Sequence, residues 1–433
     1  MDKGPKLYKK AKKIIPGGTM LLSKRPEMFL PEKWPSYFSK SSGVKVWSIE
    51  NNEYIDMIMG IGPSILGYSH PEVDKSVMHT VKNGNMTTLN CPEEVELAEK
   101  LIEINPWADM VRFARSGGEA NAIAIRIARA ASQKDNVAIC GYHGWHDWYL
   151  STNLRSKENL EEHLLPGLDT AGVPRSLEGT TFPFKYNDFE GLKHLVKRHN
   201  IGVIKMEVQR NAKPEDDFLG KVRKLATAKN IVLIFDECTS GFRETFGGLH
   251  QKYEVEPDIA MFGKALGNGY AITATVGRRE IMEAAQKSFI SSTFWTERIG
   301  PSAAIKTLEV MQREKSWEKI SATGEHIKSK WLSLAQLHNL GITISGLKAL
   351  PTFSFKSKNN LAYKTFITQE MLKKGYLASN IIYVSTVHTP EVLEKYFDAL
   401  DDIFKKIKEC EESLNILDIL EGPICHSGFS RLN

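Results

Sequence analysis

The feature that most constrains the fold is a regular alternation of short apolar runs and amphipathic helices between about residues 93 and 290. Runs of β-branched type at 137–140, 201–206 and 231–235 are each followed by polar residues or glycine. A helical pattern over 219–225 lies between the last two. Strand, helix and strand at this spacing predict a mostly parallel sheet between layers of helices. We therefore expect an α/β fold.

The 433 residues are enough for more than one domain. Residues 1–60 are rich in glycine, proline and aromatic residues, and we expect them to form an N-terminal arm and part of a small domain. Residues 61–300 are expected to form a large α/β domain. Residues 301–433 are expected to form a smaller α+β domain that ends with a helix over 390–410, which Thr389 caps.

Charge and cysteine content narrow the class of protein. The chain has 57 Lys and Arg against 52 Asp and Glu, a formal charge of +5 that is not gathered into one block. No apolar run approaches the roughly 18 residues of a membrane span. The five cysteines are scattered and form no C-x-x-C pair, which argues against a disulfide framework and a zinc site. We expect a soluble cytoplasmic protein without metal, nucleic-acid or membrane partners, and a basic segment 3–13 that docks on the protein as a helix.

The sequence Ser116-Gly117-Gly118 opens a stretch rich in alanine and isoleucine. Small residues at a helix start leave backbone N–H groups open, and the helix dipole favours an anion there. A phosphate site is one interpretation, and a tight turn with an N-cap is the other.

The apolar run 231–235 ends in two acids, Asp236 and Glu237. In a doubly wound sheet the carboxyl ends of the strands face the ligand crevice. Asp236 is placed to cap a helix, to bind a metal or to hold a buried ring nitrogen protonated.

Lys264 stands among glycines and apolar residues in the segment 257–269. Burial lowers the pKa of a lysine and frees its amine for imine chemistry. The alternative is a lysine that reaches the surface from a core strand.

Tyr142 follows the run 137–140, and His143 and His146 lie close behind it. An aromatic ring at a strand end can lie flat on a planar cofactor or pack in the core. Without nearby acidic or cysteine ligands, a metal site at the two histidines is not expected.

A phosphate site, an acid for a ring nitrogen, an imine-forming lysine and a stacking aromatic together are what pyridoxal 5′-phosphate (PLP) requires. In their order along the chain, these motifs resemble class III (fold-type I) PLP-dependent aminotransferases, and most of all glutamate-1-semialdehyde aminomutase and its relatives. The resemblance extends from 15–18 through 62–71 and the four motifs to 376–378 and His388.

The resemblance implies a role for each motif. Lys264 would form the Schiff base with PLP and move the substrate proton. Asp236 would keep the ring nitrogen protonated, and Tyr142 would stack on the ring. The other implied cofactor contacts are Ser116, Gly117 and Gly118 at the phosphate, Cys238 on the second ring face, Glu207 near the phenolic oxygen, and Thr293 from the partner subunit of a homodimer with shared active sites.

The substrate side departs from the aminomutase pattern. Where the aminomutase has an arginine for the substrate carboxylate, this chain has Lys24 and then Arg25, and lysine lacks the bidentate fork of arginine. The segment 379–383, in which the aminomutase carries an acid, offers Tyr383 instead. Arg210 is a third cation that is a candidate for an anionic substrate group.

We therefore expect an aminotransferase that moves an amino group from a small-molecule donor to a polar keto or aldehyde acceptor. Glutamate is a candidate donor and a sugar-like compound a candidate acceptor. The alternative is the intramolecular transfer of glutamate-1-semialdehyde 2,1-aminomutase. A non-catalytic protein with the same fold is disfavoured by the presence of both Lys264 and Asp236.

Overall fold

The computed structural model describes residues 3–161, 163, 166–429 and 432. Its contacts divide the chain into two compact units. Unit 1 comprises Met1–His70 and Lys319–Asn433, and unit 2 comprises Pro71–Glu318. The sequence predicts domain boundaries near residues 60 and 300. That these domains fold independently stays a prediction.

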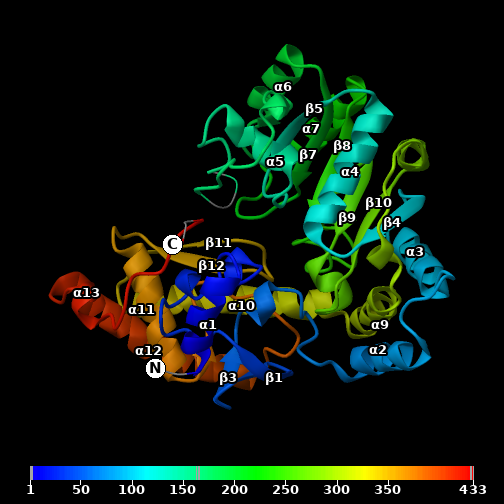
Figure 1. Ribbon diagram of the computed structural model, residues 1–433. Coiled ribbons are helices and arrows are strands. Elements are labelled where there is room, and N and C mark those ends of the chain that lie inside the picture. The colour runs from blue at the N-terminus through cyan, green and yellow to red at the C-terminus, as the bar shows by residue number, and fades with distance from the viewer. Residues whose placement is uncertain (1–2, 162, 164–165, 430–431, 433) are drawn as a thin grey trace. The chain divides into compact units, whose positions relative to one another are not determined.

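Unit 2 is built on a seven-stranded sheet with the order β4-β10-β9-β8-β7-β5-β6 (Figure 1). Strand β10 is antiparallel to both of its neighbours, and the five strands from β9 to β6 are parallel to one another. The predicted α/β class with a mostly parallel sheet is thus confirmed. The strands are β4 (Met110–Ala114), β5 (Asn136–Cys140), β6 (Thr181–Pro183), β7 (Ile201–Glu207), β8 (Val232–Glu237), β9 (Ile259–Phe262) and β10 (Thr273–Gly277).

Helices cover both faces of this sheet. Helix α4 (Gly117–Ser132) packs on β7, β8, β9 and β10, and its buried alanines and isoleucines share one apolar cluster with the strands. Helices α6 (Phe189–Arg198) and α7 (Phe218–Ala228) connect strands in the opposite direction across the sheet, so right-handed crossovers place them on the other face. The remaining α-helices of the unit are α2 (Pro71–Asn83), α3 (Pro92–Ile104), α5 (Asp147–Leu150), α8 (Arg279–Met282) and α9 (Ile299–Glu314).

Unit 1 contains two small sheets and several helices. The first sheet has the order β1-β2-β3-β13, and the second pairs β11 with β12. The strands are β1 (Phe38–Ser42), β2 (Lys45–Ser48), β3 (Glu53–Asp56), β11 (Ile342–Ser345), β12 (Thr352–Phe355) and β13 (Tyr376–Leu377). The helices are α1 (Lys3–Ile14), α11 (Asn360–Lys373), α12 (Pro390–Glu412), α13 (Ile416–Ile419) and α10 (Ser316–Leu337), which begins in unit 2.

Two local predictions in unit 1 are confirmed. The basic segment at the N-terminus forms α1, which buries Tyr8 and Ala11 and anchors the Tyr8 hydroxyl on Glu27 at 2.9 Å. Thr389 caps α12, and its side chain accepts from the amide of Val392.

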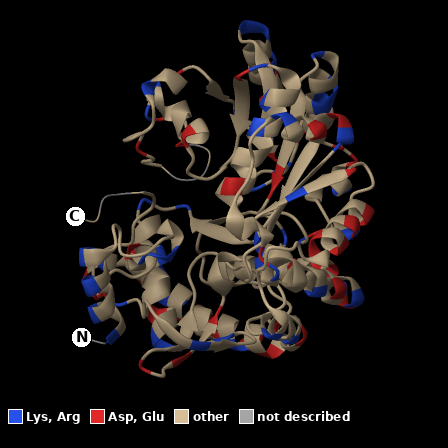
Figure 2. Cartoon of the chain, turned by 45° about the vertical axis from the view of Figure 1, so that its right-hand side comes forward, with Lys and Arg blue, Asp and Glu red and all other residues tan. Residues whose placement is uncertain are grey.

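Charged residues of both signs are interspersed along the helices of each unit (Figure 2). Among the described residues, no helix combines the length and the apolar character that crossing a membrane requires.

Candidate active site

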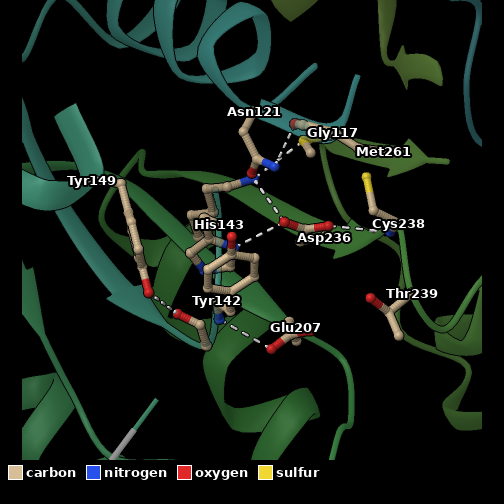
Figure 3. Close-up of polar contacts among 12 residues, drawn as sticks. Gly117, Asn121, Tyr142, His143, Tyr149, Glu207, Asp236, Cys238, Thr239 and Met261 are labelled. Carbon is tan, nitrogen blue, oxygen red and sulfur yellow. Dashed lines mark hydrogen bonds and ion pairs between the residues drawn. The ribbon is translucent and has the colours of Figure 1, made fainter. Parts of the chain in front are cut away.

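The four motifs of unit 2 meet at one edge of the parallel sheet, where strands β5, β7, β8 and β9 have their carboxyl ends (Figure 3). Tyr142 follows β5, Glu207 ends β7, Asp236 is the last but one residue of β8, and Lys264 follows β9. Ser116 stands at the start of α4, and its carbonyl accepts from the Thr273 hydroxyl at 3.4 Å. The sequence motifs thus form one site.

Helix α4 begins with a capping box. The Ser116 hydroxyl accepts from the amide of Glu119, and the Glu119 carboxylate accepts from the amide of Ser116 at 2.8 Å. Gly117 and Gly118 form the first turn, where helix amides lack acceptors within the helix. A Cβ atom on Gly118 would lie 2.8 Å from Cε1 of His146, so the close approach of that ring requires glycine. This helix start suits an anion.

Asp236 is a buried carboxylate with several partners. Its Oδ2 lies 2.9 Å from Nδ1 of His143, and its Oδ1 accepts from the amide of Cys238 at 3.1 Å (Figure 3). Burial alone would raise the pKa of Asp236, but the charge of Lys205 and the bonds from His143 and Cys238 hold it well below its usual value. Burial lowers the pKa of His143, which therefore donates from Nδ1 as a neutral ring. Asp236 is ionised and fixed in orientation.

Glu207 binds both the backbone amide of Tyr142, after β5, and the side chain of Arg210. Its carboxylate accepts from the amide of Tyr142 at 3.1 Å and from Nε and Nη2 of Arg210 at 2.9 and 2.6 Å. Arg210 also donates to the Thr239 hydroxyl at 3.4 Å. Arg210, a predicted substrate cation, therefore lies within the site, in a bidentate pair with Glu207.

Lys264 has the properties that imine formation needs. Its backbone φ of 26° lies in the left-handed region, which is strained for a residue with a side chain. Burial, followed by the charges of Arg210 and Arg243, lowers its pKa to about 7. About half of the Lys264 amines are then neutral at pH 7, and the neutral amine is the nucleophile.

Cys238 lies between the start of α4 and the segment after β9. A Cβ atom on Gly117 would lie 3.8 Å from its sulfur, and one on Gly263 would lie 3.3 Å from it. The thiol is therefore placed beside both the helix start and Lys264, which agrees with a contact to a ring bound between them.

The remaining predicted residues are Thr293 in unit 2 and Lys24, Arg25 and Tyr383 in unit 1. Thr293 is exposed in a short 3-10 helix (Thr293–Thr296). Lys24, Arg25 and Tyr383 belong to unit 1, where the Arg25 guanidinium lies 5.6 Å from the ring centre of Phe429. Their contribution to the site stays a prediction.

Sequence reasoning missed two buried partners of Asp236. The sequence context of His143 suggests only a metal ligand, and the described residues contain no cluster of His, Cys, Asp and Glu that could hold a metal ion. Lys205 was counted within an apolar run, although a lysine in a fully buried strand is rare without a partner. Lys205 was therefore the one residue in this strand pattern that pointed to a buried ion pair.

The ends of these parallel strands bring together a lysine of lowered pKa, a buried carboxylate and a helix start. Such a site suits a cofactor that has an anionic group and a basic ring. The family model of class-III aminotransferases matches residues 31–410. The chain belongs to the class-III aminotransferase family, whose members are PLP-dependent enzymes.

Named relatives cover nearly the whole chain. The 3-aminobutyryl-CoA aminotransferase of Cloacimonas acidaminovorans is 32% identical over 94% of this chain and 95% of its own length. The glutamate-1-semialdehyde 2,1-aminomutase of Methanococcoides burtonii is 30% identical over 92% of this chain and 98% of its own. These relatives confirm the resemblance seen in the sequence.

Solved structures show the same fold. A PLP internal aldimine form of the FumI protein of Sphingopyxis sp. MTA144 superimposes with a TM-score of 0.85 at 24% identity, over 96% of this chain and 99% of that one. A glutamate-1-semialdehyde aminomutase from Pseudomonas aeruginosa in complex with PMP gives a TM-score of 0.78 at 16% identity, over 93% of this chain and 94% of that one. Fold type I, as predicted, is confirmed.

The residues of this chain fit PLP. The start of α4 suits its phosphate, the ionised Asp236 suits a protonated ring nitrogen, and the amine of Lys264 suits its aldehyde. Asp236 and Lys264 stand at the ends of the adjacent strands β8 and β9, and α4 packs on both strands.

Proposed function

We propose that this protein is an aminotransferase that moves an amino group from an anionic amino donor to a polar keto or aldehyde acceptor. The observation that carries the proposal is the placement of Lys264 and Asp236 at the ends of the adjacent strands β9 and β8, beside the start of α4. A binding protein of the same fold would not need a lysine whose pKa is lowered to about 7.

In this proposal each residue has a defined task. When bound, PLP supplies an electron-accepting ring that stabilises negative charge on the substrate α-carbon. Lys264 would hold the cofactor through its amine, and the same amine would move a proton at the substrate α-carbon. Asp236 would hold a proton on the ring nitrogen, Tyr142 would orient the ring, and the amides of Gly117 and Gly118 would bind the phosphate.

Arg210 is the cation that we assign to the anionic group of the donor. Burial and then the charge of Arg210 lower the pKa of Lys264, so this guanidinium acts electrostatically on the reacting amine. The carboxylate of a donor such as glutamate would replace Glu207 as the partner of this guanidinium. The proposed acceptor is a polar carbonyl compound. One candidate is a sugar-like compound, and the name of the Cloacimonas relative suggests another, an acyl thioester with a carbonyl at C3. Lys24, Arg25 and Tyr383 stay further candidates for binding it.

The second candidate function is that of an aminomutase, in which both half-reactions occur on one substrate. The 30% identity with named aminomutases over more than nine-tenths of the chain supports it. Its product would be an isomer of its substrate, and no separate amino donor would be consumed.

A panel of amino donors tests the proposal. Purified enzyme loaded with PLP is mixed with glutamate, alanine and a neutral amine, and the loss of cofactor absorbance is followed for each. We expect glutamate to react, and Arg210→Ala to lower kcat/KM for glutamate by roughly 10²-fold more than for the neutral amine, since a charged hydrogen-bonded contact is lost. Arg198→Ala, on the exposed end of α6, is the matched control.

Two results would contradict this proposal. If Arg210→Ala lowered kcat/KM equally for the acidic and the neutral donor, Arg210 would not bind the donor carboxylate. Conversion of a single amino compound to its isomer, with no donor consumed, would establish the aminomutase instead.

We further propose a cytoplasmic homodimer with shared active sites. Phe294 and Phe289, on and beside the 3-10 helix of Thr293, are 71% and 85% exposed, and exposed aromatic side chains grouped in this way favour a covering partner. Sedimentation is expected to give about twice the chain mass of 48.7 kDa. Phe294→Asp is expected to lower the association and the PLP affinity together. A fully active monomer on dilution would exclude sharing of the site.

A further inference from the structure

Lys205 is a second buried lysine beneath the site, and the proposed mechanism does not use it. Its side chain is fully buried on β7, where Ile234 of β8 and Ile139 of β5 are its strand partners. Both isoleucines belong to the apolar cluster that α4 covers. An ammonium in such a place is costly unless it is paired.

The anion nearest to this ammonium is Asp236. Nζ of Lys205 lies 3.9 Å from Oδ2 of Asp236 and 3.1 Å from the weakly accepting sulfur of Met261. The same Oδ2 receives the hydrogen bond from His143. Burial lowers the pKa of Lys205, whereas the charge of Asp236 opposes that shift.

The next titratable groups to consider are those whose charges shift the pKa of Lys205 or Asp236. Glu207 and Cys238 act on Lys205 besides Asp236, and Lys205 itself lowers the pKa of His143. Asp236 is therefore the partner of the resident Lys205 cation and, on the proposed function, also of a ring nitrogen.

We propose that Lys205 is a positioning residue that sets the basicity of the cofactor ring nitrogen through Asp236. This inference rests on the proposed function. The Lys205 ammonium keeps Asp236 ionised and in place before the ring binds. Once the ring is bound, the two cations compete for one carboxylate, so Lys205 makes the ring nitrogen a weaker base than Asp236 alone would.

The test uses 4′-deoxypyridoxine 5′-phosphate, which has the ring and the phosphate but no aldehyde, so neither lysine can attach to it. Its ultraviolet spectrum reports whether the ring nitrogen is protonated. In Lys205→Met, which removes the charge at nearly constant volume, the midpoint of ring protonation in the bound state is expected to rise by about one pH unit or more. The protonated form should bind roughly tenfold more tightly.

Met261→Leu is the matched control, since it removes the sulfur neighbour without changing charge, and its midpoint should equal that of the wild type. Lys205→Gln, which keeps an N–H donor but no charge, should reproduce the shift of Lys205→Met and replaces that variant if it does not fold. An unchanged or lowered midpoint in folded protein would overturn the role of Lys205 while leaving the proposed function standing. No binding of the probe to wild-type protein would overturn both.

Discussion

Replacing Lys264 with alanine is expected to abolish turnover, with a loss of at least about 10⁴-fold, because the variant loses both the covalent anchor and the proton-transferring amine. PLP should still bind through the start of α4 and Asp236. The measurement pairs a transamination assay with borohydride trapping and mass spectrometry, which locates any covalently attached PLP. Lys193→Ala, an exposed lysine on α6, is the control and should keep both activity and attachment.

The lowered pKa of Lys264 gives this prediction a pH dependence. Only the neutral amine attacks the aldehyde, and a pKa of about 7 leaves roughly half of it neutral at pH 7, against roughly one in three thousand at the ordinary value of 10.5. Attachment to cofactor-free enzyme should therefore accelerate about tenfold per pH unit below pH 7 and level off above it. Arg210→Ala should move the levelling to higher pH, since a cation that lowers the pKa is removed. Retained turnover in Lys264→Ala, or attachment at another lysine, would refute the assignment.

The sequence was sufficient to predict the α/β fold and the meeting of the motifs at one sheet edge, because both follow from local patterns. Apolar runs separated by amphipathic helices specify parallel strands, and parallel strands bring their carboxyl ends to one edge. Residues that directly follow such runs, namely Tyr142, Asp236 and Lys264, are consequently brought together whatever the details of packing. The glycines before α4 are located by the same reasoning.

The pairings within the site depend on strand register and on side-chain direction, which the sequence does not specify. Glu207 stands opposite Asp236 in the register of β7 and β8, but its carboxylate turns to Arg210, three residues along its own chain. His143 and Asp236 meet across 93 residues of sequence. A lysine within an apolar run signals that Lys205 needs a partner, but only its neighbours across the sheet identify that partner as Asp236.

Replacing Asp236 with asparagine is expected to lower kcat by roughly 10²–10³-fold, the usual effect of removing one preorganised electrostatic group from a transition state. Asparagine keeps the size of the side chain and can still accept from the amide of Cys238, so the phosphate and the ring should remain bound. What is lost is the negative charge that keeps the ring nitrogen protonated. Steady-state kcat and the dissociation constant of PLP separate the two effects, and kcat should fall far more than affinity.

The same substitution should also destabilise the cofactor-free enzyme. Lys205 would be left buried without its carboxylate, and breaking a buried ion pair in this way typically costs about 3–5 kcal/mol in the free energy of unfolding. Because the native pKa of Asp236 lies below its unfolded value, its ionised form stabilises the protein at neutral pH, and this contribution disappears only in strong acid. Denaturant unfolding at pH 7 therefore measures the full effect.

A double-mutant cycle separates the charge pair from other contributions. The double variant Lys205→Met with Asp236→Asn has no unpaired charge, and it should be more stable than Asp236→Asn alone although it is equally impaired in kcat. Asp258→Asn is the control for a half-buried, paired aspartate elsewhere in unit 2, since Asp258 pairs with Arg223 at 3.0 Å, away from the site. It should lose stability but retain kcat and the affinity for PLP. Wild-type kcat in Asp236→Asn would mean that the ring nitrogen does not depend on this carboxylate, and the proposed mechanism would then be wrong at its central step.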